Sequence, residues 1–198
     1  MKRQNVLFDV HGCLADFTGG CVGLIGVNFP HIEWNKEHIV DWDFWHSIPC
    51  DEAKAYMLEH MIKSTFISSL PVIEAGLRVY EELVDLGHNV KICTTPLPGE
   101  NEQSSRNAVR KWVRFHLGNK AADQMIFSFD KTRERADVII DDKPVLTQNK
   151  VDIQFKHWLI VDHLYNRNLP EDSTLLPIGR INTDWSNWEE EFSKVELV

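Results

Sequence analysis

Four apolar runs of the sequence, each typical of a buried strand, lead to side chains that could do chemistry. These side chains are Asp9, Thr94, Lys131 and the adjacent pair Asp141 and Asp142. Carboxylates gathered at one point repel each other and hold protons more tightly unless a cation joins them. Oxygen ligands from aspartate suit Mg²⁺, which is commonly shared with a substrate phosphate. A lysine and a threonine could then bind the phosphate oxygens, which leaves Asp9 free to attack phosphorus.

These side chains can meet only if the strands that carry them lie side by side in one sheet. Five apolar runs have the length of buried strands: 6–8, 90–95, 125–129, 136–140 and 157–161. Four segments have apolar residues at helical spacing: 51–62, 74–86, 104–117 and 186–195. Strands that alternate with helices predict the α/β class with a doubly wound, mostly parallel sheet. The carboxyl ends of such strands converge at one edge, where ligands bind.

The stretch between the first two predicted strands differs from the rest of the chain. A glycine-rich run at 18–26 lacks the lysine and the Ser/Thr of a phosphate-binding loop, so we interpret it as a hinge. Residues 27–70 are rich in aromatic and histidine side chains, which either form a small core or stack on a planar ligand. Phe44 and Trp45 are the candidates for stacking. The expected domains are a core, 1–17 with 71–198, and a small helical insertion, 18–70.

The composition is that of an ordinary globular protein and excludes several classes of function. Of the 198 residues, 43% are hydrophobic and 26% are charged. A formal net charge of −9 argues against a nucleic acid polymer as partner, so any anion site must be built locally. We expect no membrane association, because the sequence has neither a run of about 18–20 apolar residues nor a signal-peptide pattern. Four cysteines without C-x-x-C spacing suit reduced thiols in the cytoplasm.

The order of the chemical groups along the chain resembles that of the haloacid dehalogenase superfamily of phosphohydrolases. The fuller resemblance is to its 5′(3′)-deoxyribonucleotidase branch and extends from Val6 to about Asp162. The motifs that carry it are Asp9–Phe17, Ile92–Pro96, Trp112 with His116–Gly118, Asp130–Thr132 and Ile140–Lys143. The resemblance implies a Rossmann-like core with a small helical cap, which here would be the insertion over 18–70.

The resemblance also implies a Mg²⁺-dependent phosphomonoesterase that acts on deoxyribonucleoside monophosphates. Asp9 would be the nucleophile and would form an aspartyl-phosphate. Thr94 and its neighbour Thr95 would bind the substrate phosphate, and Lys131 would neutralise charge on both the nucleophile and the phosphate. The implied partner is a small-molecule nucleoside monophosphate, and a homodimer is left open.

The ligands of Mg²⁺ and the contacts of the base follow from the same resemblance. The metal ligands would be Asp9, the backbone carbonyl of His11, Asp141 directly, and Asp142 either directly or through water. The aromatic side chains that contact the base would be Phe17, Phe44 and Trp45.

The chain departs from the family pattern at His11, where the family has a second aspartate that acts as general acid and base. A histidine suits both roles, since its unperturbed pKa is about 6.5. A protonated ring beside a metal ion is disfavoured, however, and loss of a positioned acid/base costs about 10²–10⁴-fold in rate. A second departure is Phe129, where the branch often has a basic residue. Three alternatives stay open: an enzyme in which His11 either serves as the acid and base or weakens turnover, a nucleotide-binding or regulatory protein without useful turnover, and a phosphatase for another small phosphomonoester.

Overall fold

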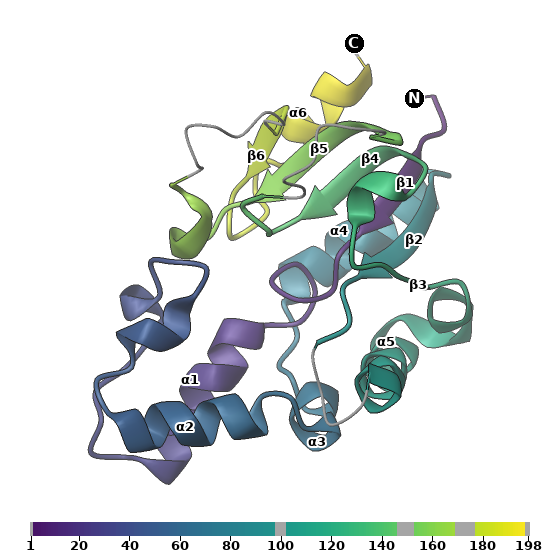
Figure 1. Cartoon of the computed structure of the whole chain (residues 1–198). Helices are drawn as coiled ribbons and strands as arrows, with labels where there is room; N and C mark the ends of the chain where they lie inside the picture. The colour runs from purple at the N-terminus through teal and green to yellow at the C-terminus, as the bar shows by residue number, and fades with distance from the viewer. Residues whose placement is uncertain (1, 98–101, 146–152, 169–176, 197–198) are drawn as a thin grey trace.

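The computed structural model describes residues 2–97, 102–145, 153–168 and 177–196 (Figure 1). The strands are β1 (Asn5–Phe8), β2 (Asn89–Thr94), β3 (Ile126–Phe127), β4 (Ala136–Asp141), β5 (Phe155–Val161) and β6 (Gly179–Ile181). The α-helices are α1 (Phe17–Asn28), α2 (Asp51–His60), α3 (Ser64–Ser68), α4 (Glu74–Asp85), α5 (Glu102–Asp123) and α6 (Trp188–Ser193). The 3₁₀-helices are η1 (Lys36–His38), η2 (Phe44–Ser47), η3 (Lys131–Arg133), η4 (Leu164–Asn166) and η5 (Lys194–Glu196). Within the described ranges, no helix combines the length and the apolar composition needed to cross a membrane.

The strands form one parallel sheet with β1 at its centre. The order is β3-β2-β1-β4-β5-β6. Leu7 of β1 pairs with Lys91 of β2 on one side and with Ile139 of β4 on the other. The predicted α/β class with a parallel sheet is confirmed, and β6 is a short strand that the apolar pattern did not reveal. Because the strands are parallel, the carboxyl ends of β1, β2 and β4 meet at one edge.

The side chains of β1 alternate between hydrophobic clusters on the two faces of the sheet. Val6 and Phe8 belong to a cluster that includes residues of α4, α5 and α6, and Leu7 belongs to a cluster with β4 and β5 side chains. Phe8 is fully buried, and Trp185 stacks on it with ring centroids 5.5 Å apart. Full burial of such a side chain stabilises a fold by about 1.5–3 kcal/mol. The strand that leads to Asp9 is therefore fixed from both faces.

The helices between β1 and α4 lie beyond the carboxyl ends of the strands (Figure 1). The buried side chains of this region form a hydrophobic cluster that includes Ile25, Trp34, Phe44 and Met57. Part of the aromatic-rich stretch thus forms a small core, which is one of the two roles that the sequence left open. The division of the chain at residues 18–70 stays a prediction.

The glycine-rich run at 18–26, which we interpreted from the sequence as a hinge, lies within helix α1. α1 begins at Phe17, and the side chain of Asp16 caps it by accepting a hydrogen bond from the N–H of Gly19 at 2.9 Å. Gly20 allows a close approach of neighbouring side chains, since a Cβ there would lie 2.7 Å from Cδ2 of Leu70. Glycine therefore serves packing at this position.

Candidate active site

Asp9 lies just past the carboxyl end of β1, where the chain turns. Its N–H donates to the carbonyl of Ile140 at 3.0 Å, so the ladder with β4 extends one residue beyond the strand. Gly12 follows with a φ of 75°, in the left-handed region that favours glycine. A Cβ at Gly12 would lie only 2.0 Å from Oδ2 of Asp142. Glycine is therefore what lets the loop after Asp9 approach Asp142.

Lys131 lies between two carboxylates at this edge of the sheet. Its Nζ is 2.7 Å from Oδ1 of Asp9 and 2.6 Å from Oδ2 of Asp141. All three side chains are buried. Burial alone would lower the pKa of Lys131, but the charges of Asp141 and Asp9 outweigh it and raise that pKa above its usual range. Lys131 is therefore a cation at neutral pH that balances the carboxylate of Asp9.

The adjacent residues Asp141 and Asp142 have different partners. Asp141 pairs with Lys131 and also accepts a hydrogen bond from the N–H of Lys143 at 2.9 Å. Oδ2 of Asp142 accepts a hydrogen bond from the hydroxyl of Tyr165 at 2.5 Å. The resemblance implied that Asp141 binds a metal ion directly, whereas in the structure its carboxylate is engaged by the lysine.

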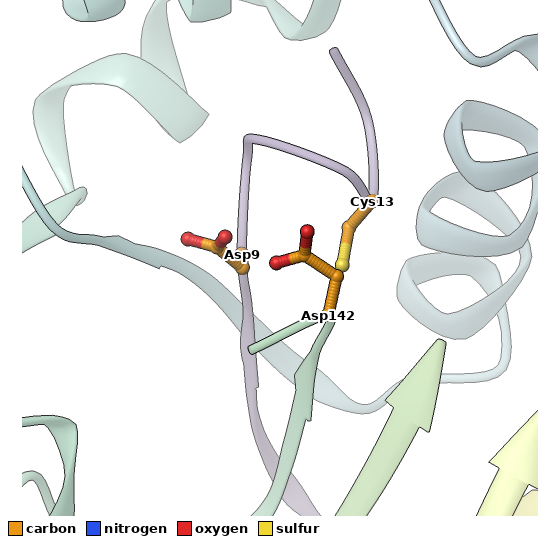
Figure 2. Close-up of side chains that lie close together, drawn as sticks. All are labelled: Asp9, Cys13 and Asp142. Carbon is orange, nitrogen blue, oxygen red and sulfur yellow. The ribbon is translucent and has the colours of Figure 1, made fainter. Parts of the chain in front are cut away.

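Asp9, Cys13 and Asp142 form a group that could hold a metal ion. One potential ligand atom from each lies within 4.8 Å of the others. Figure 2 shows the Asp142 carboxylate between that of Asp9 and the sulfur of Cys13. Burial, followed by the charges of Asp141 and Asp9, raises the pKa of Asp142 well above its usual range, and a divalent cation would relieve this crowding. Burial also raises the pKa of the Cys13 thiol, which leaves a neutral sulfur that suits Mg²⁺ poorly. The carboxylate oxygens of Asp9 and Asp142 therefore fit a hard divalent cation.

Two buried polar atoms beside this group have no hydrogen-bond partner among the described residues. They are Oγ1 of Thr94, at the end of β2, and Nε2 of His11. The hydroxyl of Thr95 is already engaged, since it donates to the carbonyl of Ser128 at 3.1 Å. Burial, followed by the charge of Lys131, lowers the pKa of His11 to about 4. The imidazole of His11 is therefore neutral at pH 7.

A cavity of about 370 Å³ opens above these groups. Its polar lining includes Asp9, His11, Thr94, Thr95, Lys131, Asp141 and Asp142. Its apolar lining includes Phe17, Trp42, Phe44, Trp45, Met61, Pro96 and Leu97. The structure thus brings every candidate site residue that we named from the sequence to one cavity. Phe129 lies outside this lining and is exposed.

Trp42 and Tyr165 also line the cavity, although the sequence alone did not single them out. Their rings meet edge to face with centroids 5.8 Å apart. Trp42 belongs to the aromatic-rich stretch, where no spacing distinguishes it from its neighbours. Tyr165 comes shortly after β5, so its position beyond a strand end is the signal that could identify it.

Replacing Lys131 with methionine should lower the free energy of unfolding at pH 7 by about 3–5 kcal/mol, because two buried carboxylates lose their cation. Burial already raises the pKa of Asp141, and a carboxyl group with a raised pKa in the folded state stabilises the fold as pH falls. The loss should therefore be smaller at about pH 5 than at pH 7, as urea unfolding can measure. The matched control is Lys156→Met, which removes an exposed ion pair with Asp137 and should cost less than about 1 kcal/mol. Equal losses in both variants would contradict the buried pairing.

Comparisons with known proteins place the chain in a family. The family model described as "5' nucleotidase, deoxy (Pyrimidine), cytosolic type C protein" matches residues 3–174. A putative 5'(3')-deoxyribonucleotidase of Bordetella parapertussis is 30% identical over 188 residues, which cover 92% of each chain. The human 5'(3')-deoxyribonucleotidase, cytosolic type, is 28% identical over 195 residues, 96% of this chain and 93% of that one.

A solved structure shows that the fold is also shared with a more distant protein. It is a HAD family hydrolase from Deinococcus radiodurans R1, with bound phosphate and sodium. The TM-score is 0.59 with 99% of this chain and 97% of that chain covered, and the sequences are 11% identical, so the likeness concerns the fold alone. Because the family model covers most of the chain, the resemblance found in the sequence is confirmed. The chain belongs to the 5′(3′)-deoxyribonucleotidase family and is a phosphoric monoester hydrolase.

Proposed function

We propose that the chain is a Mg²⁺-dependent phosphatase of deoxyribonucleoside monophosphates that works through a phosphoryl group on Asp9. We further propose that His11 reduces its turnover. The observation that carries the proposal is the contact of Asp9 with Lys131 beside Asp142, at the polar end of a cavity with aromatic walls. The four cysteines are free thiols, which supports a location in the reducing cytoplasm.

The substrate phosphate would bind at the polar end of the cavity. Lys131 offers a positive charge there, and Thr94 offers a hydroxyl that has no partner among the described residues, so a phosphate can be bound locally although the whole chain is negatively charged. A carboxylate oxygen of Asp9 attacks phosphorus, and the bond from phosphorus to the nucleoside oxygen breaks. The departing oxygen takes up a proton. Water then attacks the aspartyl-phosphate, loses a proton, and releases inorganic phosphate as the Asp9 carboxylate is restored.

The residues that would hold Mg²⁺ are Asp9, Asp142 and the backbone carbonyl of His11, while Asp141 keeps Lys131 in place. This proposed metal site is supported by the crowding of the buried carboxylates of Asp9 and Asp142. When bound, the cation supplies the positive charge that allows an anionic phosphate to approach an anionic nucleophile. Removal of divalent cations with EDTA should therefore stop phosphate release, and added Mg²⁺ should restore it.

His11 lines the cavity two residues after Asp9, at the position to which the family resemblance assigns both proton transfers. Its imidazole is neutral at pH 7, and its pKa of about 4 makes it a weak base. A general acid or base works best when its pKa lies near the working pH. Slow turnover is therefore the expected consequence. The same observation favours a second candidate function, a nucleotide-binding protein without useful turnover.

The substrate class is supported by the aromatic side chains of the cavity. Phe17 contacts both His11 and Phe44 through edge-to-face ring contacts, with centroids 5.6 and 6.4 Å apart, so these rings connect the polar end to the apolar wall. Trp45 extends the wall from Phe44. Stacking of a base on an aromatic side chain contributes about 1–3 kcal/mol.

A substrate panel tests the proposal. Deoxyribonucleoside monophosphates should be hydrolysed with a kcat/KM at least about tenfold above that of sugar phosphates, because only a base can use the stacking contacts. Trp45→Ala should lower kcat/KM for the nucleotides by about tenfold and leave sugar phosphates unchanged. Equal rates for both classes of substrate in the parent protein would show that the aromatic wall does not select nucleotides.

A further inference from the structure

The short helix η4 contacts both segments that carry the proposed metal ligands. Before it, Nε2 of His163 lies 2.7 Å from the carbonyl oxygen of Gly12, and it must donate because that oxygen can only accept. Within it, the hydroxyl of Tyr165 donates to Oδ2 of Asp142 at 2.5 Å. Nδ2 of Asn166 also donates to the backbone carbonyl of Asp142, at 2.7 Å. The loop after β1 and the end of β4 are therefore held by residues that lie close together in the sequence.

The side chains in and just before η4 that make these contacts are packed and anchored. The rings of His163 and Tyr165 are stacked, with centroids 4.8 Å apart and planes 7° from parallel. Tyr165 is 8% exposed and Asn166 is fully buried. Nη1 of Arg180 donates to Oδ1 of Asn166 at 2.9 Å and to Oδ1 of Asp162 at 2.8 Å, which ties η4 to β6. A stack anchored in this way can transmit a fixed geometry to the two loops that it contacts.

The hydroxyl of Tyr165 is hydrogen-bonded to the carboxylate of Asp142, and this carboxylate lies beside Asp9. Only one oxygen of Asp142 is engaged by Tyr165, and the position beside Asp9 is left for a cation. Oδ2 of Asp142 also lies against Gly12, since a Cβ there would be 2.0 Å from this oxygen and 2.9 Å from the hydroxyl of Tyr165. Rotation of the carboxylate would move Oδ2 out of this position and break its bond to Tyr165. The hydrogen bond therefore selects one orientation of the proposed ligand.

We propose that Tyr165 is a positioning residue that holds Asp142 in the orientation for binding a divalent cation, with the stacked His163 fixing the Gly12 loop to the same unit. The inference rests on the proposed metal site. It concerns the affinity for the cation and not the chemical step, because Tyr165 acts through Asp142. Partners that orient metal ligands in this way typically account for about 10–100-fold in metal affinity or activity.

Mn²⁺ binding to the whole protein, followed by electron paramagnetic resonance without substrate, tests the inference. Tyr165→Phe keeps the stacked ring and should raise the Kd for Mn²⁺ by about 10–100-fold. The Mg²⁺ concentration that gives half-maximal phosphate release should rise by a similar factor in this variant, because it has lost affinity for the cation. The matched control is Tyr56→Phe, which removes a tyrosine hydrogen bond to Asn28 in the helical region and should leave the Kd unchanged.

A second variant tests the stacked unit. His163→Phe keeps a ring for the stack but loses the donor to Gly12, so it should also raise the Kd for Mn²⁺. In the double variant, the fold-change in the Kd for Mn²⁺ should be smaller than the product of the two single fold-changes, because both side chains belong to one stacked unit. A parent protein that binds no Mn²⁺ would overturn the metal site itself. A parent that binds Mn²⁺ while Tyr165→Phe binds it equally well would overturn only the role of Tyr165.

Discussion

Asp9→Asn should release phosphate from deoxyribonucleoside monophosphates at least about 10³-fold more slowly than the parent protein, because the amide cannot form an aspartyl-phosphate. The variant should fold, since Lys131 keeps its buried contact with Asp141. Single-turnover measurements with mass spectrometry should detect a phosphorylated parent protein and no phosphorylated variant. The effect should be the largest of any single substitution in the site.

The control for this substitution is Asp137→Asn at the opposite end of β4. Asp137 accepts hydrogen bonds from Asn5 and Lys156, away from the carboxyl edge of the sheet. The Asp137→Asn variant should keep more than about half of the parent activity, since surface changes away from a site have small effects. Activity of Asp9→Asn within about tenfold of the parent would rule out the covalent mechanism, because removal of a nucleophile costs far more than that.

His11→Asp should raise kcat by about 10²-fold, because it restores a carboxyl group that can give and take protons in both steps. His11→Asn is the matched control, since it has a similar size to aspartate and cannot exchange a proton. It should have a kcat no higher than that of the parent. Steady-state phosphate release at saturating Mg²⁺ and nucleotide measures all three proteins.

The parent value in the same experiment decides between the two candidate functions. Slow but measurable turnover in the parent, with a large gain in His11→Asp, supports an enzyme of reduced rate. Negligible turnover in the parent with the same gain supports the nucleotide-binding protein. A parent as fast as His11→Asp, and faster than His11→Asn, would show that His11 is itself an effective acid and base.

The location of the candidate site could be predicted because it depends on the ends of strands. Asp9, Thr94 and Asp141 each lie at or just past the end of a strand, and a parallel sheet places such residues together whatever the details of its packing. The partner of each carboxylate could not be predicted in the same way. Neighbouring residues of an extended chain point in opposite directions, so only one of Asp141 and Asp142 can face Lys131. Which one does so is set by packing between distant segments.

The elements that sequence reasoning missed lack a periodic apolar pattern. α1 contains several glycines, which are typical of loops, and it is stabilised by its cap at Asp16 and by its neighbours. β6 is too short for an alternating pattern and is formed by pairing with β5. By contrast, Gly118 marks the predicted end of a helix, and in the structure it interrupts α5 with a φ of 83°. Local sequence signals therefore predicted an element correctly where tertiary contacts favour the same structure.

The stack of Trp185 on Phe8 has a consequence for synthesis of the protein. Phe8 belongs to the first strand to be made, whereas Trp185 is made among the last of the described residues. Contacts between segments far apart in the sequence form late and slow folding. A growing chain that has not yet reached Trp185 therefore leaves uncovered the face of Phe8 on which Trp185 stacks, one residue from Asp9. Incomplete chains should accordingly be inactive and should be recognised by chaperones and proteases.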